Sequence, residues 1–204
     1  MALNGLILHW TQNIAVALVA MSNPSLGAEV ARADSVPRLV RKIEFGDYGS
    51  RHIRLGDLDG DGLPDLLLVQ ADPSTAYITC LTAIDLDGKI LWQVGSPDIR
   101  NSYYKGDNVQ IYDLDHDGRN EVIYNSDEKT AVTILDGKTG SVKKKVQISG
   151  KYSKYDTLFF LDFNGRGFPQ EIFLADAFSH GFSVFDRDFK QLWSKQDPIS
   201  ATTP

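Results

Sequence analysis

The chain has 204 residues, 42% of them hydrophobic and 24% charged, which is enough for one globular domain with its own core. Its formal net charge of −6 argues against a nucleic-acid partner, because binding to phosphates requires a basic face. The single cysteine, Cys80, excludes an internal disulfide. It alternates in step with Ile78, Thr82 and Ile84, which predicts a buried thiol on one face of a strand.

The N-terminal segment has the features of an export signal. Residues 14–21 form an apolar stretch too short to span a bilayer, and Ala31-Arg-Ala33 fits the small-x-small pattern of a cleavage site. No Lys or Arg precedes Arg32, so the basic region that usually opens such a signal is missing. We expect residues 1–33 to be a signal peptide, the protein to be secreted or periplasmic, and the chain to lack a stable membrane span.

Two nine-residue segments share one acidic pattern: Asp57-Leu-Asp-Gly-Asp-Gly-Leu-Pro-Asp65 and Asp113-Leu-Asp-His-Asp-Gly-Arg-Asn-Glu121. Each places carboxylates at positions 1, 3, 5 and 9 and a glycine at position 6. Such a cluster of hard oxygens suits Ca²⁺, with the position-7 carbonyl as a further ligand. An acidic surface turn would explain one such loop, but two in the same register predict about two bound Ca²⁺. The predicted metal ligands are Asp57, Asp59, Asp61, Leu63, Asp65, Asp113, Asp115, Asp117, Arg119 and Glu121.

The surroundings of these loops exclude the helix-loop-helix calcium hand. That motif takes a bidentate carboxylate from position 12, which is Leu68 in the first loop and Tyr124 in the second. Short, β-prone apolar runs follow at 66–69 and 122–124, so we predict calcium loops between strands. Two bound ions would move the formal charge from −6 to −2, which accounts for much of the acidity.

The loops belong to an internal repeat with three copies. The third copy, Asp162-Phe-Asn-Gly-Arg-Gly-Phe-Pro-Gln-Glu171, has Arg166 at position 5 and Gln170 at position 9. We predict that it is free of metal, with the Arg166 guanidinium in the place of the ion. In each copy one strand leads into the loop, a second leaves it, and a hairpin completes the unit, as in the Asp87-Gly88 turn of the first copy.

Four strands in roughly 50 residues, repeated, predict an all-β fold of propeller blades. A β-sandwich is the main alternative, but it does not predict a loop in matching register in every copy. We expect three blades, over about 46–96, 107–150 and 155–196, followed by a tail at 197–204. Closed propellers have ~4–8 blades, so further blades or self-association are expected to complete the ring. Residues 36–45 are a candidate outermost strand of a preceding blade.

These repeats resemble the FG-GAP or VCBS-type repeats of calcium-containing β-propellers. The run Ala83-Ile-Asp-Leu-Asp-Gly-Lys-Ile-Leu-Trp92, followed by residues 112–122, is also similar to the propeller of rhamnogalacturonan lyases of family eleven. The resemblance covers about residues 50–196 and implies pectin cleavage by β-elimination, which needs a cation, a base and a proton donor. The lyases carry a histidine in the linker between the first hairpin and the second loop, and residues 100–106 here have none.

Two classes of function follow. The first is a non-catalytic calcium propeller that binds an acidic polysaccharide or a protein partner; the second is a rhamnogalacturonan lyase or a fragment of one. We expect the first and assign no catalytic residue, because an ordinary exposed loop explains the linker better than a catalytic site does. The candidate ligand-binding residues of the linker are Arg100, Tyr103, Tyr104 and Lys105.

Overall fold

The computed structural model describes residues 39–101, 108–127, 130–148, 155–176 and 181–196. The predicted signal peptide and the tail at 197–204 lie outside these residues. The chain divides into two units, Met1–Phe45 and Gly46–Pro204. Within the first unit, Ile43 and Phe45 are buried, but residues 39–45 form no strand. The expected strand at 36–45 is therefore wrong for residues 39–45, because alternation of apolar residues does not by itself supply a paired neighbour.

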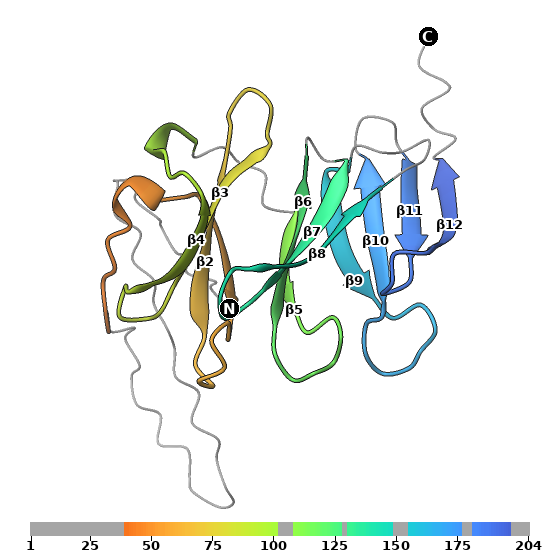
Figure 1. Ribbon diagram of the computed structural model, residues 1–204, viewed down its shortest axis with the longest axis horizontal. Coiled ribbons are helices and arrows are strands. Elements are labelled where there is room, and N and C mark those ends of the chain that lie inside the picture. The colour runs from red at the N-terminus through yellow and green to blue at the C-terminus, as the bar shows by residue number, and fades with distance from the viewer. Residues whose placement is uncertain (1–38, 102–107, 128–129, 149–154, 177–180, 197–204) are drawn as a thin grey trace, which may run out of the picture. The chain divides into compact units, whose positions relative to one another are not determined.

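The second unit is all-β, as predicted, and contains three four-stranded antiparallel sheets (Figure 1). In each sheet the strands follow one another in sequence order, so each sheet is one propeller blade. Two three-residue 3-10 turns, η1 (Gly46–Tyr48) and η2 (Ile99–Asn101), accompany the strands.

The first blade contains β1 (His52–Gly56), β2 (Asp65–Ala71), β3 (Ile78–Ile84) and β4 (Ile90–Gly95). The second contains β5 (Val109–Tyr112), β6 (Glu121–Ser126), β7 (Ala131–Asp136) and β8 (Val142–Gln147). The third contains β9 (Thr157–Leu161), β10 (Glu171–Asp176), β11 (Gly181–Phe185) and β12 (Gln191–Gln196).

Burial follows the position of a strand within its blade. Every residue of β2 is buried, whereas β8 exposes most of its residues. A strand covered on both faces needs a continuous apolar run, and a strand at the edge of a sheet does not. The buried thiol of Cys80 on β3 confirms the prediction for that residue.

Each pair of neighbouring blades shares a core. One cluster joins the first and second blades through residues such as Leu67 and Val122, and another joins the second and third through Ile123 and Ile172. A hydrogen bond is also repeated between the first strands of neighbouring blades. Arg54 Nε donates to the Val109 carbonyl at 2.9 Å, and the corresponding Gln110 Nε2 donates to the Leu158 carbonyl at 2.8 Å. Both blade interfaces therefore combine a shared apolar cluster with a hydrogen bond between first strands.

Candidate metal loops

Each of the three loops lies between the first and second strands of its blade. The residue that ends the loop also begins the second strand and pairs across the sheet with the residue before the loop. In the first and second blades these pairs are Asp65 with Gly56 and Glu121 with Tyr112. In the third blade Glu171, not Gln170, pairs with Leu161. The alignment that placed Gln170 at position 9 is wrong, because the third loop is one residue longer and its final acid is Glu171.

Two hydrogen bonds hold all three loops in the same shape. One oxygen of the first aspartate accepts a bond from the amide of the position-6 glycine, at 3.0, 2.9 and 2.8 Å in the three loops. The final acid accepts a bond from the amide of position 2, which is Leu58 at 2.8 Å, Leu114 at 2.8 Å and Phe163 at 3.1 Å. Each glycine has a positive φ, at 85°, 86° and 90°, which favours glycine over residues with a Cβ. The first and last acids therefore have a structural role.

The acids at positions 3 and 5 exceed what this shape requires. The third loop keeps the same two bonds with Asn164 and Arg166 at those positions. In the first loop the same positions hold Asp59 and Asp61. In the first loop the middle acids also accept backbone amides, that of Asp61 at Asp59 and that of Leu63 at Asp61, but the third loop keeps its frame without acids at these positions.

In the first loop, carboxylate oxygens of Asp57, Asp59 and Asp61 all lie within 4.8 Å of one another. In the part of the chain that the structure describes, none of these three acids pairs with a Lys or Arg side chain. Asp65 is buried, and its Oδ2 faces the amides of Leu58 and Asp59. Burial raises the pKa of Asp65, the backbone hydrogen bonds oppose that change, and the charges of Asp59 and Asp61 add to it. Among the described residues, no Lys or Arg side chain therefore neutralises the negative charge of Asp57, Asp59 and Asp61.

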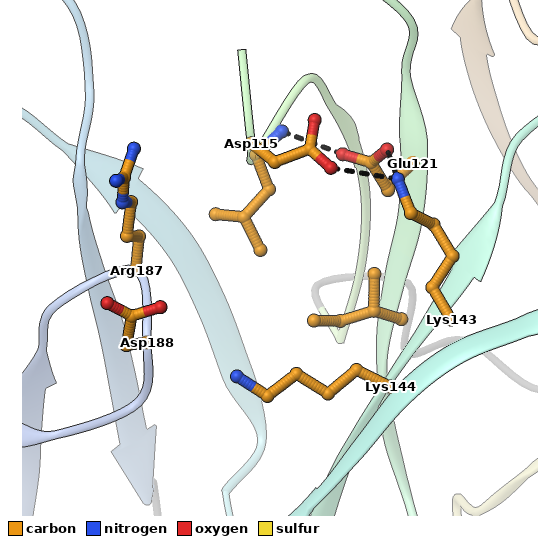
Figure 2. Close-up of a pocket in the computed structure, with 8 residues that line it drawn as sticks. Asp115, Glu121, Lys143, Lys144, Arg187 and Asp188 are labelled. Carbon is orange, nitrogen blue, oxygen red and sulfur yellow. Dashed lines mark hydrogen bonds and ion pairs between the residues drawn. The ribbon is translucent and has the colours of Figure 1, made fainter. Parts of the chain in front are cut away.

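In the second loop, the converging carboxylates are those of Asp113, Asp115 and Glu121. Here a protein cation is present: the Nζ atom of Lys143 on β8 lies 2.7 Å from Glu121 Oε1 and 2.9 Å from Asp115 Oδ2 (Figure 2). The pKa of Lys143 is raised, first by its bond to Glu121 and then by its bond to Asp115. Asp117 instead pairs with the Arg119 guanidinium at 3.0 Å.

The predicted ligand sets are thus brought together in part. Each cluster contains three of the four predicted carboxylates, without Asp65 in the first loop and without Asp117 in the second. Asp65 turns an oxygen to backbone amides, and Asp117 turns an oxygen to Arg119. The remaining donors are all oxygen atoms, and Ca²⁺ takes 6–8 oxygen ligands at 2.3–2.6 Å, so the chemistry of both loops fits this ion.

The third loop differs from its prediction in one further respect. The Arg166 guanidinium donates to Gln170 Oε1 at 2.5 Å, while the Asp162 carboxylate accepts bonds from the backbone amides of Arg166 and Gly167. Asn164 donates its side-chain amide to Glu171. The guanidinium therefore bonds to an amide oxygen. The pKa of Asp162 is lowered first by the backbone amide of Arg166 and less by the charge of the guanidinium.

The linker proposed for ligand binding is only partly described. Arg100 lies in η2 with its side chain 85% exposed, and it pairs with Asp98 at 2.5 Å. This pairing lowers the pKa of Asp98 to about 2, chiefly through the hydrogen bond from the guanidinium. Tyr103, Tyr104 and Lys105 lie outside the described residues.

Sequence reasoning missed two residues of these sites, Glu171 and Lys143. The signal for Glu171 is that β2, β6 and β10 each begin on an acid. The signal for Lys143 is its alignment with Leu91 and Leu192 in the fourth strands of the other blades. Lys143 also lines a pocket of about 360 Å³ between the second and third blades, together with Lys144, Arg187 and Asp188 (Figure 2).

Comparison with known proteins gives no family. No family model matches the chain, and no curated protein matches it. The similar solved structures include a rhamnogalacturonan lyase PL11 of Bacillus licheniformis, with 18% identity and a TM-score of 0.46 over 71% of this chain and 34% of that one. Another is the exotype rhamnogalacturonan lyase YesX, with 18% identity and a TM-score of 0.48 over 71% and 32%. A third is the C-terminal domain of PilY1 from Pseudomonas aeruginosa, with 16% identity and a TM-score of 0.46 over 74% and 34%.

The chain spans about a third of the length of each of these three proteins. At such identities and TM-scores, the similarity does not assign an activity. Within the described residues, the helices are three-residue turns, and none is long or apolar enough to cross a membrane.

Proposed function

We propose that this chain is a calcium-binding β-propeller module in which the first and second loops each hold one Ca²⁺. The observation that carries the proposal is the convergence of Asp57, Asp59 and Asp61 within 4.8 Å, without a described Lys or Arg partner. Three carboxylates this close repel one another, and a divalent cation removes that repulsion. Loss of the position-3 and position-5 acids from the third loop, whose shape is retained, supports the same assignment.

The number of sites tests the proposal. Calorimetric titration of chelator-stripped protein with CaCl₂ is expected to give about two sites, since three carboxylates converge in each of two loops. Asp59→Ala and Asp115→Ala are each expected to remove one site. Asn164→Ala, the matched change in the third loop, is expected to leave the count unchanged. Absence of calcium binding would refute the proposal, and a third site would refute the assignment of the third loop.

The proposal extends to a location and a ligand. We place the module outside the cytoplasm, where calcium is abundant and weak sites are filled, and give it an acidic polysaccharide or a protein as partner. Support for this part comes from the apolar stretch at 14–21 and from the cationic and aromatic residues Arg100, Tyr103, Tyr104 and Lys105.

A binding module and a pectin lyase give different results with the same substrate. The module is expected to bind polygalacturonate, to lose that binding in the double variant Tyr103→Ala, Tyr104→Ala, and to keep two calcium sites. A lyase would instead release an unsaturated uronate that absorbs in the ultraviolet. Calcium-dependent release of this product, abolished by Lys105→Ala, would replace the binding function with the enzymatic one.

A further inference from the structure

The second loop already contains a cation supplied by the protein. Glu121 is 2% exposed, and its two oxygens have different partners: Oε2 accepts the Leu114 amide and Oε1 accepts the Lys143 ammonium. The same ammonium lies 2.9 Å from Asp115 Oδ2. Lys143 thus binds two of the three converging carboxylates, those of Glu121 and Asp115. At Glu121 it binds Oε1, the oxygen that does not accept the Leu114 amide.

A backbone irregularity places Lys143 over the loop. Along β7 and β8, Ile134 pairs with Lys144 and Leu135 pairs with Val142, so Lys143 is skipped. A bulge of this kind re-aims the side chain of the extra residue. The fourth strands of the other blades have the same shift and skip Leu91 and Leu192. The backbone feature is therefore common to all three blades, and the cation is special to the second.

Leu91 and Leu192, the residues skipped in the other two blades, show how an uncharged side chain packs at this position. Leu91 packs against the hydrophobic cluster between the first and second blades. Leu192 lines a pocket beside Asn164, Arg166 and Glu171 of the third loop, as Lys143 lines the pocket beside the second. Leucine is therefore compatible with this bulge, and folding does not require a lysine there.

We propose that Lys143 is a resident counter-ion of the second loop which a divalent metal must displace, so that the second loop binds calcium more weakly than the first. This inference rests on the proposed calcium function and concerns the difference between its two sites. A divalent cation and an ammonium that compete for Glu121 Oε1 and Asp115 Oδ2 repel each other across a few ångströms. The 360 Å³ pocket gives the lysine side chain room to withdraw. In this pocket the Lys143 ammonium would approach Lys144 and Arg187, and repulsion between these like charges raises the free energy of its displacement. The negative charge of Asp188 offsets part of that repulsion.

The test isolates the second loop in an Asp59→Ala background and compares two variants of one strand. Lys143→Leu introduces the residue of the other blades, and Lys145→Leu removes a lysine that pairs with the exposed Asp127 at 2.7 Å. Lys143→Leu is expected to lower the Kd for Ca²⁺ by at least about tenfold, equivalent to about 1.4 kcal/mol. Lys145→Leu is expected to leave that Kd within about twofold. Lys143→Arg, which keeps a cation, is expected to remain weak.

A second readout separates competition from a structural role. With chelator, Lys143→Leu is expected to lower the melting temperature, because Glu121 loses its partner; with calcium, the same variant is expected to gain a larger melting shift than wild type. Equal calcium affinity of wild type and Lys143→Leu at the second loop would overturn this inference and leave the two-site proposal standing. Absence of calcium binding to either wild-type loop would overturn both.

Discussion

The first and second loops share a backbone frame and differ in the source of positive charge. Both use the first aspartate to bind the position-6 glycine and the final acid to bind position 2. The first loop has no Lys or Arg paired with Asp57, Asp59 or Asp61 among the described residues, whereas the second has Lys143 on its carboxylates. The first and last acids therefore hold the shape of each loop, and Lys143 on the fourth strand distinguishes the charge of the second loop from that of the first.

The third loop extends the comparison. It keeps the frame with Asp162 and Glu171, and the side-chain amide of Asn164 donates to the final acid there. The three loops thus represent three ways to satisfy the same buried acid, with backbone amides alone, with an ammonium, or with an amide side chain.

The largest expected effect is that of calcium on stability. Removal of calcium by chelator is expected to lower the melting temperature, because each occupied site adds about 2.7 kcal/mol at a hundredfold excess over Kd. Thermal unfolding of Asp59→Ala and Asp115→Ala, with and without calcium, measures how much of the calcium-dependent change in melting temperature comes from each loop. We expect Asp59→Ala to remove the larger part, since no described Lys or Arg side chain pairs with Asp57, Asp59 or Asp61 and could replace the ion. Equal melting temperatures of wild type in calcium and in chelator would contradict the proposal that calcium stabilises the blades.

Much of this comparison could be predicted from the sequence. The strands, the three-fold repeat and the two acidic loops follow from alternation and spacing, which are local properties of the chain. Lys143 could not be found in that way, because its place depends on a shift in the pairing of β7 and β8. Glu171 was missed for a related reason: the pairing with Leu161 reveals the extra loop residue, and the letters of the loop do not.

A smaller effect is expected when each final acid is neutralised in chelator. Asp65→Asn keeps an acceptor for the Leu58 amide and removes a buried charge, so the free energy of unfolding is expected to stay constant or to rise. Glu121→Gln also keeps an acceptor for Leu114 but weakens the bond to Lys143. We expect it to lower the free energy of unfolding by about 1 kcal/mol, below the ~1.5–3 kcal/mol of a buried charged hydrogen bond because Lys143 is 33% exposed. Urea unfolding measures both, and equal losses in the two variants would mean that the loops do not differ in charge compensation.

The smallest expected effect is a loss of stability with rising pH that comes from Asp65 of the first loop. The folded state raises the pKa of Asp65 above 3.8, chiefly through burial, so the folded chain binds this proton more tightly than the unfolded chain does. In chelator, the contribution of Asp65 to stability is therefore expected to fall as the pH rises from 3.8 through the raised pKa. Lowered pKa values occur at Asp72, Asp98 and Asp162. Their contributions to stability are present above pH 3.8 and are lost as the pH falls below it.

The ammonium of Lys143 does not itself lose its proton in the pH range in which Asp65 titrates. Its pKa is raised above 10.5, so its stabilising contribution is complete below pH 10.5 and is lost only at higher pH. Urea unfolding between about pH 4 and 7 in chelator is expected to show a steeper loss of stability for wild type than for Asp65→Asn. An identical slope in Asp65→Asn and wild type would show that the unneutralised charge of the first loop carries no energetic cost, and the contrast between the two loops would then be one of geometry alone.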